Sequence, residues 1–547
     1  MHPLNKLLLA ITTGLLLSLG WTSFGPGLVL LIAFVPLLFL EGVIYKHRNK
    51  NHSYTILPYA LLAFGIWNGL SVWWVWNAAA IGAIAAVIIN TSLMSLVFWL
   101  FHMSKRLLHE RASYFALIFL WIGFEYFHTR WELNFPWLNL GNGLVKDLHF
   151  IQWYEYTGIT GGTFWILLSN IFFYKSIQLY LKYQTVHASL MHAGTWLLII
   201  LIPSWISFHI FKNYTESGES RQFVVVQPNI DPYNEKFSSL SMDQQVDKIL
   251  QLAKQQADSS VNYFIGPETA LPEIIPMKEL YRNRSVNTIQ EYEHLWPNSS
   301  WIIGAQTRDF YPEDKPDMPV TARRIRNSDT YYDNYNTALF LTQDGSIASY
   351  HKSQLVVGVE KMPFPKTMKF LEKMILDLGG TTGSLGVEKE RKVFVDDEGF
   401  GLAPIICYES IYGEFVTEYV RKGANFLVVI TNDGWWGDTP GYKQHWRFSQ
   451  LRAIETRRAV ARSANTGISG FINQKGEIIV SSDYWVEDCL KSKLVSNDQL
   501  TFYVRYGDFI GRIFSFTAVL LILYLITLRL IRKNIPETGR LGVLPQP

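Results

Sequence analysis

The 547-residue sequence has few charged residues for its length. Asp, Glu, Lys and Arg together make up 17% of it, whereas an ordinary soluble protein contains roughly 25%. The net charge is only +3 and no Lys/Arg-rich run occurs, which argues against a nucleic-acid partner. Aromatic residues are abundant instead, with 19 Trp and 34 Phe. Low charge combined with many aromatic rings is typical of a membrane protein.

Cysteine is also scarce. The two cysteines, Cys407 and Cys489, lie far apart and have no CxxC or His spacing, so the sequence indicates neither a zinc site nor a disulfide framework. A single disulfide between them is compatible with the sequence and would leave Cys407 without a free thiol. Cys489 lies far from every other motif and is interpreted as structural. We expect neither a metal ion nor an organic cofactor.

Hydrophobic segments of membrane-spanning length dominate the first two hundred residues. The first of them also fits a signal peptide, but no small-x-small cleavage site follows it, which favours an uncleaved helix. We predict eight transmembrane helices, near Leu7–Leu19, Gly25–Tyr45, Ile56–Val75, Ala79–His102, Tyr114–Phe127, Thr163–Leu181, Ala193–Phe211 and Phe509–Ile531.

Positive charge alternates between the short loops. Cytoplasmic loops carry an excess of Lys and Arg, so this alternation predicts both termini in the cytoplasm. The domain prediction is a membrane domain at 1–212 with seven helices, a periplasmic domain at 213–508, an eighth helix at 509–532 and a cytoplasmic tail at 533–547. The residues that orient the chain are Lys46, Arg48, Lys50, Lys105, Arg106, Arg111, Lys182, Arg529, Arg532 and Lys533.

Short apolar strands alternate with helices and polar turns between Arg221 and Asp508, which predicts one layered α/β or α+β domain. We expect helices at Ser241–Gln256 and Gln444–Ala464, and a loop at Asp309–Asp333. The turns at Asp344-Gly345 and Lys475-Gly476 predict β-hairpins. The amphipathic stretch at Lys366–Leu385 predicts a mobile arm that touches lipid.

Cys407 follows a short apolar run, Leu402–Ile406, that predicts a buried strand. A thiol at the point where a strand ends and a helix begins suits a nucleophile, because backbone N–H groups there are aimed at an anion. A free cysteine is more often a small buried hydrophobe, so this residue alone leaves both readings open.

Two other polar residues follow predicted strands. Glu268 lies in the rigid sequence Pro267-Glu268-Thr-Ala-Leu-Pro272, and Lys352 follows a predicted hairpin. A carboxylate can take the proton of a thiol, and an ammonium can lower the thiol pKa and stabilise an oxyanion. With Cys407, the three residues have the parts of a cysteine acyl-transfer site.

Aromatic segments accompany these residues. The turn Asn432–Gly437 contains Trp435 and Trp436, which either cover a pocket or press against the membrane. The loop His128–Gly162 contains Trp137 and is expected to cap the helix bundle; lining an acyl-chain entrance is the alternative.

The order Glu268, Lys352, Cys407 resembles the Glu-Lys-Cys triad of the nitrilase (carbon–nitrogen hydrolase) superfamily. With the predicted spans, nearly the whole chain resembles the bacterial apolipoprotein N-acyltransferase family. The most specific similarities are Ile406-Cys407-Tyr408-Glu409 and the eight-residue step from Lys352 to Glu360. Others are Phe135-Pro136-Trp137-Leu138, Gln227-Pro228-Asn229-Ile230, Tyr335-Asn336-Thr337, Asn432–Gly437, Arg452–Glu455 and Asn465-Thr466-Gly467.

This resemblance implies a periplasmic α-β-β-α sandwich on an eight-helix membrane base. It implies Glu268 as general base, Lys352 as oxyanion-stabilising cation and Cys407 as nucleophile. Glu360 would be a second active-site glutamate, and Tyr408 and Glu409 would support the site.

Two departures from the family pattern occur. The chain reads Leu355-Val-Val-Gly-Val-Glu360 where the family usually has Leu-Val-Pro-Phe-Gly-Glu, so the backbone path before Glu360 is expected to differ. Phe237 stands where the family commonly has tryptophan. We predict that Phe237, Trp137, Trp435 and Trp436 contact substrate.

The functional hypothesis is a ping-pong acyl transfer at the bacterial inner membrane. A phospholipid, by resemblance phosphatidylethanolamine at its sn-1 ester, would acylate Cys407, and the amine of a lipoprotein's diacylglyceryl-cysteine would accept the chain. We expect the protein to act as a monomer. The alternatives are a membrane-tethered amidase of the nitrilase type, and a non-catalytic transporter or scaffold.

Overall fold

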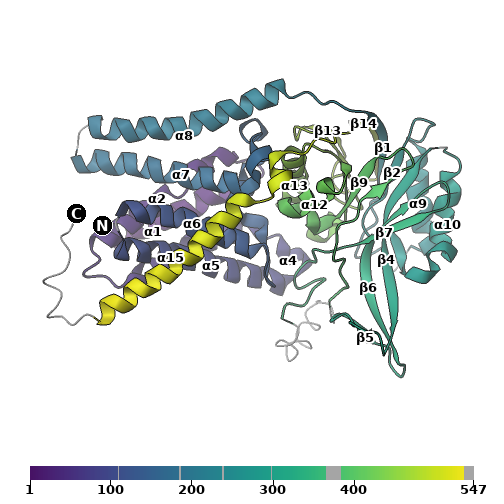
Figure 1. Cartoon of the computed structure of the whole chain (residues 1–547), viewed down its shortest axis with the longest axis horizontal. Coiled ribbons are helices and arrows are strands. Elements are labelled where there is room, and N and C mark those ends of the chain that lie inside the picture. The colour runs from purple at the N-terminus through teal and green to yellow at the C-terminus, as the bar shows by residue number, and fades with distance from the viewer. Residues whose placement is uncertain (109, 184–185, 237–239, 297, 365–383, 535–547) are drawn as a thin grey trace.

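A computed structural model describes residues 1–108, 110–183, 186–236, 240–296, 298–364 and 384–534 (Figure 1). A helical bundle forms one end of the molecule and two β-sheets form the other. The N-terminus and the far end of the yellow helix α15 both lie at the end of the bundle away from the sheets. Residues 366–383 of the predicted lipid-touching arm lie outside the described residues, as does Phe237.

Helices cover all eight predicted hydrophobic ranges. Within the described residues, five helical segments are long and apolar enough to cross a membrane: Gly27–Lys46, Ser53–Val72, Ala80–Leu107, Ser189–Asn213 and Phe509–Ile531. The membrane character is therefore supported, and the count of eight spans stays a prediction. The helices are α1 Pro3–Leu19, α2 Val35–Lys46, α3 Leu57–Val72, α4 Val75–Ala78, α5 Ala80–Leu107, α6 Glu110–His128, α7 Tyr154–Tyr183, α8 Val186–Asn213 and α15 Phe509–Asn534.

Buried carboxylates of the bundle have polar partners. Glu41 accepts a hydrogen bond from Lys105 at 2.6 Å and lies 2.8 Å from a ring nitrogen of His102. Glu125 accepts hydrogen bonds from the backbone N–H of Leu140 at 2.7 Å and from the hydroxyl of Thr163 at 2.6 Å. Such pairing is what makes a buried charge tolerable.

Within the described residues, the second half of the chain forms two sheets. The first has eight strands: β1 Ser220–Gln227, β2 Tyr263–Ile265, β3 Leu271–Pro276, β4 Ser300–Pro312, β5 Arg323–Arg324, β6 Thr330–Leu341, β7 Ile347–His351 and β14 Asp488–Val495. The second has six, in the order β13-β12-β11-β10-β9-β8: β8 Phe394–Val395, β9 Gly401–Ile406, β10 Ala424–Thr431, β11 Ala459–Ala464, β12 Gly470–Ile472 and β13 Ile478–Ser481.

Side chains of the central strands point alternately into two different cores, which gives the domain four layers. Phe223 of β1 packs against Phe426 of the second sheet, with ring centroids 5.1 Å apart. Its neighbour Val224 belongs to a separate core formed with helices α9 (Met242–Lys254) and α10 (Arg284–Glu293). Successive side chains of a strand point to opposite faces, so one sequence serves both layers. Helices α12 (Gly413–Arg421) and α13 (Pro440–Thr456) cover the second sheet on the bundle side (Figure 1), which gives the predicted α-β-β-α order.

Two sequence predictions are wrong in part. The helix predicted at Gln444–Ala464 ends at Thr456; Arg457 adopts a left-handed φ of 51°, and Ala459–Ala464 forms strand β11, parallel to β10. Pairing within a buried sheet overrides the helix propensity of this charged segment. The loop predicted at Asp309–Asp333 is shorter, because β4 and β6 extend as a ladder in which Asp309 pairs with Asp333.

Both predicted hairpins are confirmed. The turn at Asp344-Gly345 joins the antiparallel strands β6 and β7, and the turn at Lys475-Gly476 joins β12 and β13. Gly345 has a φ of 82° and Gly476 a φ of 84°, a conformation that glycine adopts without steric cost.

Gln444 of α13 joins the sheet domain to the bundle. Its side-chain carbonyl accepts a hydrogen bond from the indole of Trp137 at 2.6 Å. Its amide donates to the backbone carbonyls of Trp21 at 2.9 Å and Ser71 at 3.2 Å. One buried amide thus connects three separate segments of the bundle.

Truncating this amide should loosen the junction between the two halves. We expect Gln444→Ala to cost about 1–3 kcal/mol for each buried partner left unpaired, which would lower the midpoint of thermal unfolding in detergent. The neighbouring exposed Lys443→Ala is the control and should unfold as the wild type does. An unchanged midpoint for Gln444→Ala would show that the junction does not depend on this residue.

Candidate active site

Cys407 lies at the end of β9, where the chain turns into the short helix η8 (Cys407–Ile411). All six residues of β9 are buried, so the strand fixes the position of the thiol. Cys407 has a φ of 51°, a left-handed conformation that is strained for a side chain with a Cβ atom. Both cysteines are free, so no bridge to Cys489 silences the thiol.

Glu409 ties this turn to the segment that follows β7. One carboxylate oxygen accepts the backbone N–H of Ile406 at 2.9 Å. The other accepts the hydroxyl of Tyr350 at 2.8 Å and the backbone N–H of Ser353 at 2.7 Å. Burial raises the pKa of Glu409 to about 7, against these hydrogen bonds. The residue therefore positions Cys407 and Lys352 relative to each other.

Lys352 lies between two carboxylates. Its Nζ donates to Oε1 of Glu268 at 3.1 Å and to Oε1 of Glu360 at 2.8 Å. Lys352 is 1% exposed and Glu268 6%. Glu360 is held in turn by the backbone N–H of Val356, 2.9 Å from Oε2. The structure thus brings together Glu268, which follows β2, Lys352, which follows β7, and Glu360, which lies in the next loop.

Asn336 of β6 completes the surroundings of Glu268. Its side-chain amide donates to Oε1 of Glu268 at 2.7 Å and to Oε1 of Glu360 at 3.3 Å. The backbone N–H of Asn432 donates to the other oxygen of Glu268 at 3.1 Å. We did not single out Asn336 from the sequence, although it lies in the quoted motif Tyr335-Asn336-Thr337.

The charges of this group act on the thiol. Burial raises the pKa of Cys407 and Glu268 raises it further, whereas Lys352 lowers it. Although burial acts to lower the pKa of Lys352, the carboxylates of Glu268 and Glu360 beside it raise that pKa well above its usual range. Among the described residues, no hydrogen bond joins the sulfur to Glu268 or Lys352. The raised pKa of Cys407 favours the protonated thiol, so forming a nucleophilic thiolate requires a base.

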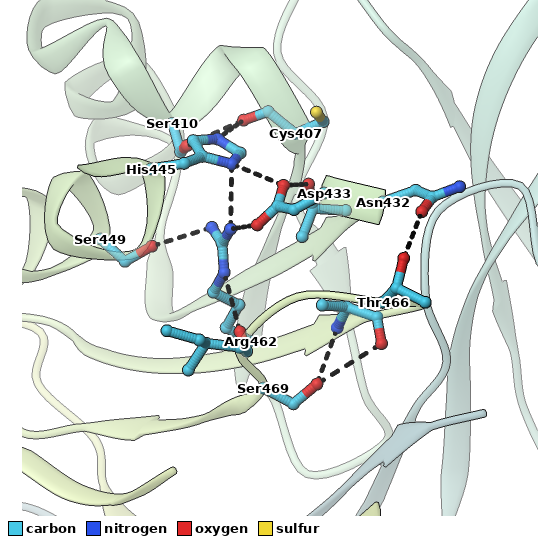
Figure 2. A network of polar contacts seen from close by, with 12 residues as sticks. Cys407, Ser410, Asn432, Asp433, His445, Ser449, Arg462, Thr466 and Ser469 are labelled. Atoms are coloured by element: carbon cyan, nitrogen blue, oxygen red, sulfur yellow. Dashed lines mark hydrogen bonds and ion pairs between the residues drawn. The ribbon is translucent and has the colours of Figure 1, made fainter. Parts of the chain in front are cut away.

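A second polar network lies next to Cys407 (Figure 2). Nδ1 of His445 lies 2.8 Å from Oδ1 of Asp433, and Arg462 donates to Oδ2 of Asp433 at 2.7 Å. All three side chains are buried. Burial acts to raise the pKa of Asp433, but the charges of His445 and Arg462 lower it overall.

This network reaches the backbone of Cys407. The carbonyl oxygen of Cys407 accepts the hydroxyl of Ser410 at 2.8 Å and lies 3.2 Å from Nε2 of His445. Two contacts on one carbonyl stabilise the strained turn. His445 and Arg462 are not predicted from the sequence, because a polar residue on a helix or strand gives no local signal that it will be buried.

The cluster of Cys407, Asp433 and His445 also has metal-ligand chemistry, since one atom of each lies within 4.8 Å of the others. Arg462 occupies the carboxylate of Asp433 and also lies 3.0 Å from Nδ1 of His445. A guanidinium at that distance repels a cation, so the residues present fit a metal ion poorly.

A cavity of about 450 Å³ extends from Cys407 into the membrane bundle. Its wall at the sheet domain includes Cys407, Tyr408 and His445, and its wall at the bundle includes Trp74 and the start of α5. The loop Val356–Phe364, which carries Glu360, lines another side, together with Trp137 and Trp436. The thiol thus meets a mostly apolar space that continues along helix α5.

The four residues predicted to contact substrate have different positions. Trp137 and Trp436 line the cavity, with ring centroids 5.9 Å apart. Trp435 packs on Tyr233 instead, at 5.2 Å. Phe237 lies outside the described residues. The loop that contains Trp137 therefore both caps the bundle and lines the cavity, so the two sequence alternatives are compatible.

The opposing charges around Cys407 predict opposite shifts of its pKa. We expect Glu268→Gln to lower the thiol pKa, because a negative charge is removed, and Lys352→Met to raise it. The pH dependence of iodoacetamide alkylation, in a Cys489→Ser background, measures both shifts. Lys389→Met removes an exposed cation outside the site and should leave the profile unchanged. Shifts of the same sign in both active-site variants would contradict this electrostatic account.

The ion pair of Asp433 predicts a large effect on stability. Asp433→Asn leaves the buried Arg462 without its counter-charge, which typically costs about 3–5 kcal/mol. Because the native pKa of Asp433 lies below its unfolded value of 3.8, its contribution is complete above that pH and disappears as the pH falls further. Denaturant unfolding at pH 7 measures the loss. Asp438→Asn, an exposed site in the same turn, should match the wild type; a similarly small loss for Asp433→Asn would refute the assignment.

Two family models match the chain. Residues 13–172 match the apolipoprotein N-acyltransferase N-terminal domain, and residues 225–498 match carbon-nitrogen hydrolase. A Chlorobaculum tepidum protein named apolipoprotein N-acyltransferase is 28% identical over 518 residues, which cover 92% of this chain and 93% of the relative. A Geobacter metallireducens protein of the same name is 25% identical and covers 92% of each chain.

Solved structures show a weaker similarity. An amidase from Nesterenkonia sp. is 15% identical, covers 53% of this chain and 94% of its own, and has a TM-score of 0.34. This value is too low to carry an argument.

Proposed function

We propose that this chain, which belongs to the carbon-nitrogen hydrolase family, transfers an acyl chain from a phospholipid to the N-terminal diacylglyceryl-cysteine of a lipoprotein. The proposal rests on its similarity, over 92% of its length, to apolipoprotein N-acyltransferases. The whole-length similarity makes the chain an acyltransferase. The acyl donor, the covalent intermediate and the roles of the site residues are part of this proposal.

One observation carries this proposal. The cavity that contains Cys407 is lined largely by apolar side chains and continues onto membrane helix α5. A soluble amide would need no such space, whereas a fatty acyl chain gains roughly 0.8 kcal/mol for each buried methylene. The position of the thiol between a polar wall and an apolar cavity favours an acyl ester with a long chain as substrate.

In the first half-reaction, Glu268 takes the proton of Cys407 and the thiolate attacks the ester carbonyl of the phospholipid. Lys352 and the backbone N–H of Tyr408 stabilise the oxyanion of the tetrahedral intermediate. The C–O bond breaks, a thioester forms, and Glu268 returns the proton to the departing alkoxide of the lysophospholipid. By resemblance, the sn-1 ester of phosphatidylethanolamine is the donor.

In the second half-reaction, the amine of the lipoprotein's diacylglyceryl-cysteine attacks the thioester carbonyl. Glu268 accepts a proton from the attacking nitrogen, the C–S bond breaks and an amide forms. Protonation of the thiolate restores neutral Cys407. Dividing the exchange in two replaces one difficult encounter of two membrane lipids with two simpler ones.

The proposed setting is the bacterial inner membrane, with the sheet domain in the periplasm. Both substrates are anchored in lipid, which explains why the catalytic domain is joined to a helical bundle. The alternation of Lys and Arg between the short loops supports this orientation. The eight spans, the domain limits and a monomeric state are part of the same proposal.

The proposal predicts an acyl-enzyme. Purified protein incubated with phosphatidylethanolamine should gain the mass of an acyl chain on Cys407, and an acceptor peptide bearing diacylglyceryl-cysteine should remove it. Cys407→Ala should form no adduct and Cys489→Ser should form it normally, because Cys489 lies in β14 away from the cavity. Intact-protein mass spectrometry measures both. A wild-type protein that never gains the acyl mass would overturn the mechanism.

A further inference from the structure

The part of the cavity farthest from the sheets lies along α5. Helix α4 contacts the sheet domain, where Asn77 donates to the carbonyl of Trp436 at 2.8 Å, and α5 runs from there away from the sheets (Figure 1). Its lining residues recur every three or four positions, which places them on one helix face. They are Ile81, Gly82, Ala85, Ala86, Ile89 and Asn90.

The dimensions of this face suit an alkyl chain. Ile81 and Asn90 are nine residues apart, which corresponds to about 14 Å at 1.5 Å per residue. Between them, Gly82, Ala85 and Ala86 leave room because their side chains are small. A Cβ atom on Gly82 would meet only the Cβ of Ala79, at 3.2 Å.

The lining ends at a polar group. Asn90 is 1% exposed, and its Oδ1 lies 2.8 Å from Nε2 of His128. Trp131 donates its indole N–H to Nδ1 of His128 at 2.7 Å, so the ring proton of the neutral imidazole is on Nε2 and donates to Asn90. The amide orientation of Asn90 is therefore fixed, and its Nδ2 has no partner among the described residues.

This end opposes further entry of an apolar chain. Methylene groups cannot accept a hydrogen bond from the unpaired Nδ2–H of Asn90. Contact with an alkyl chain therefore does not offset the free-energy cost of burying this polar group. The Asn90–His128–Trp131 series is also rigid, since each ring or amide is held by the next. The apolar lining on α5 thus ends at a polar boundary formed by Asn90.

We propose that Asn90, held by His128 and Trp131, sets the upper length of the acyl chain that Cys407 carries. The chain lies along the small residues of α5, and its terminal methyl stops at Asn90. This inference rests on the proposed acyl-enzyme and adds a determinant of chain-length specificity. The small side chain of Ala86 leaves the chain room to pass along the helix face as far as Asn90.

The test is a competition among donors. Wild type and variants are incubated with an equimolar series of phosphatidylethanolamines whose saturated chains differ by two methylene groups, and the Cys407 adducts are resolved by mass spectrometry. Asn90→Ala should extend the distribution to longer chains. Ala86→Leu should shorten it, by about tenfold in yield for each methylene that no longer fits. Ile88→Ala, on the exposed face of α5 outside the lining, should keep the wild-type distribution.

The outcomes separate the two proposals. A wild type that forms no Cys407 adduct with any donor overturns the proposed function, and this inference falls with it. Adducts that form with the wild-type distribution in Asn90→Ala and Ala86→Leu overturn the inference alone. If one of these variants fails to fold, the other decides, because their expected shifts have opposite directions.

Discussion

The position of Lys352 between Glu268 and Glu360 is the interaction on which the site depends. A lone ammonium or carboxylate at this depth would be strongly destabilising, so each of the three charges is tolerable only because the others are present. In the proposed mechanism, transfer of the thiol proton to Glu268 moves a negative charge from oxygen to sulfur without creating a new one. Glu360 remains as the counter-ion of Lys352 when Glu268 is neutral, which explains why the site has a second glutamate.

The same arrangement requires the turn at Cys407 to be held firmly. Its left-handed backbone is strained, and its carbonyl and flanking groups are fixed from two directions, by Glu409 on one side and by His445 on the other. The two carboxylates involved differ in environment. Glu409 accepts hydrogen bonds from neutral donors and has a raised pKa, whereas Asp433 is paired with Arg462 and has a lowered one. The turn is thus held by one carboxylate with neutral hydrogen-bond donors and by another with charged partners.

Strand ends explain why so much of the site was predictable from the sequence. Glu268 and Cys407 each follow a short apolar run and Lys352 follows a predicted hairpin, so the sequence predicts all three at strand ends. His445, Arg462 and Asn336 gave no such signal, because their roles come from contacts between segments far apart in the chain. The same limit applies to the segment after Thr456: its alternating charges favour a helix, whereas the structure buries Arg458 just before β11 and Arg462 within it. Tertiary pairing decided that element, and only the structure shows it.

The apolar cavity also bears on why an enzyme of this fold would transfer an acyl group rather than hydrolyse it. A thioester on Cys407 with its chain along α5 would fill the space beside the sulfur and exclude water from it. Trp137 and Trp436 line that space, and their side chains have no polar group besides the indole N–H. The N–H of Trp137 already donates to Gln444, so of these two rings only Trp436 could orient a water molecule for attack. An amine delivered on its own lipid anchor arrives at high local concentration next to the membrane. Burial of one chain and anchoring of the other substrate therefore favour the amine over bulk water, with the same Glu268 acting as base in either reaction.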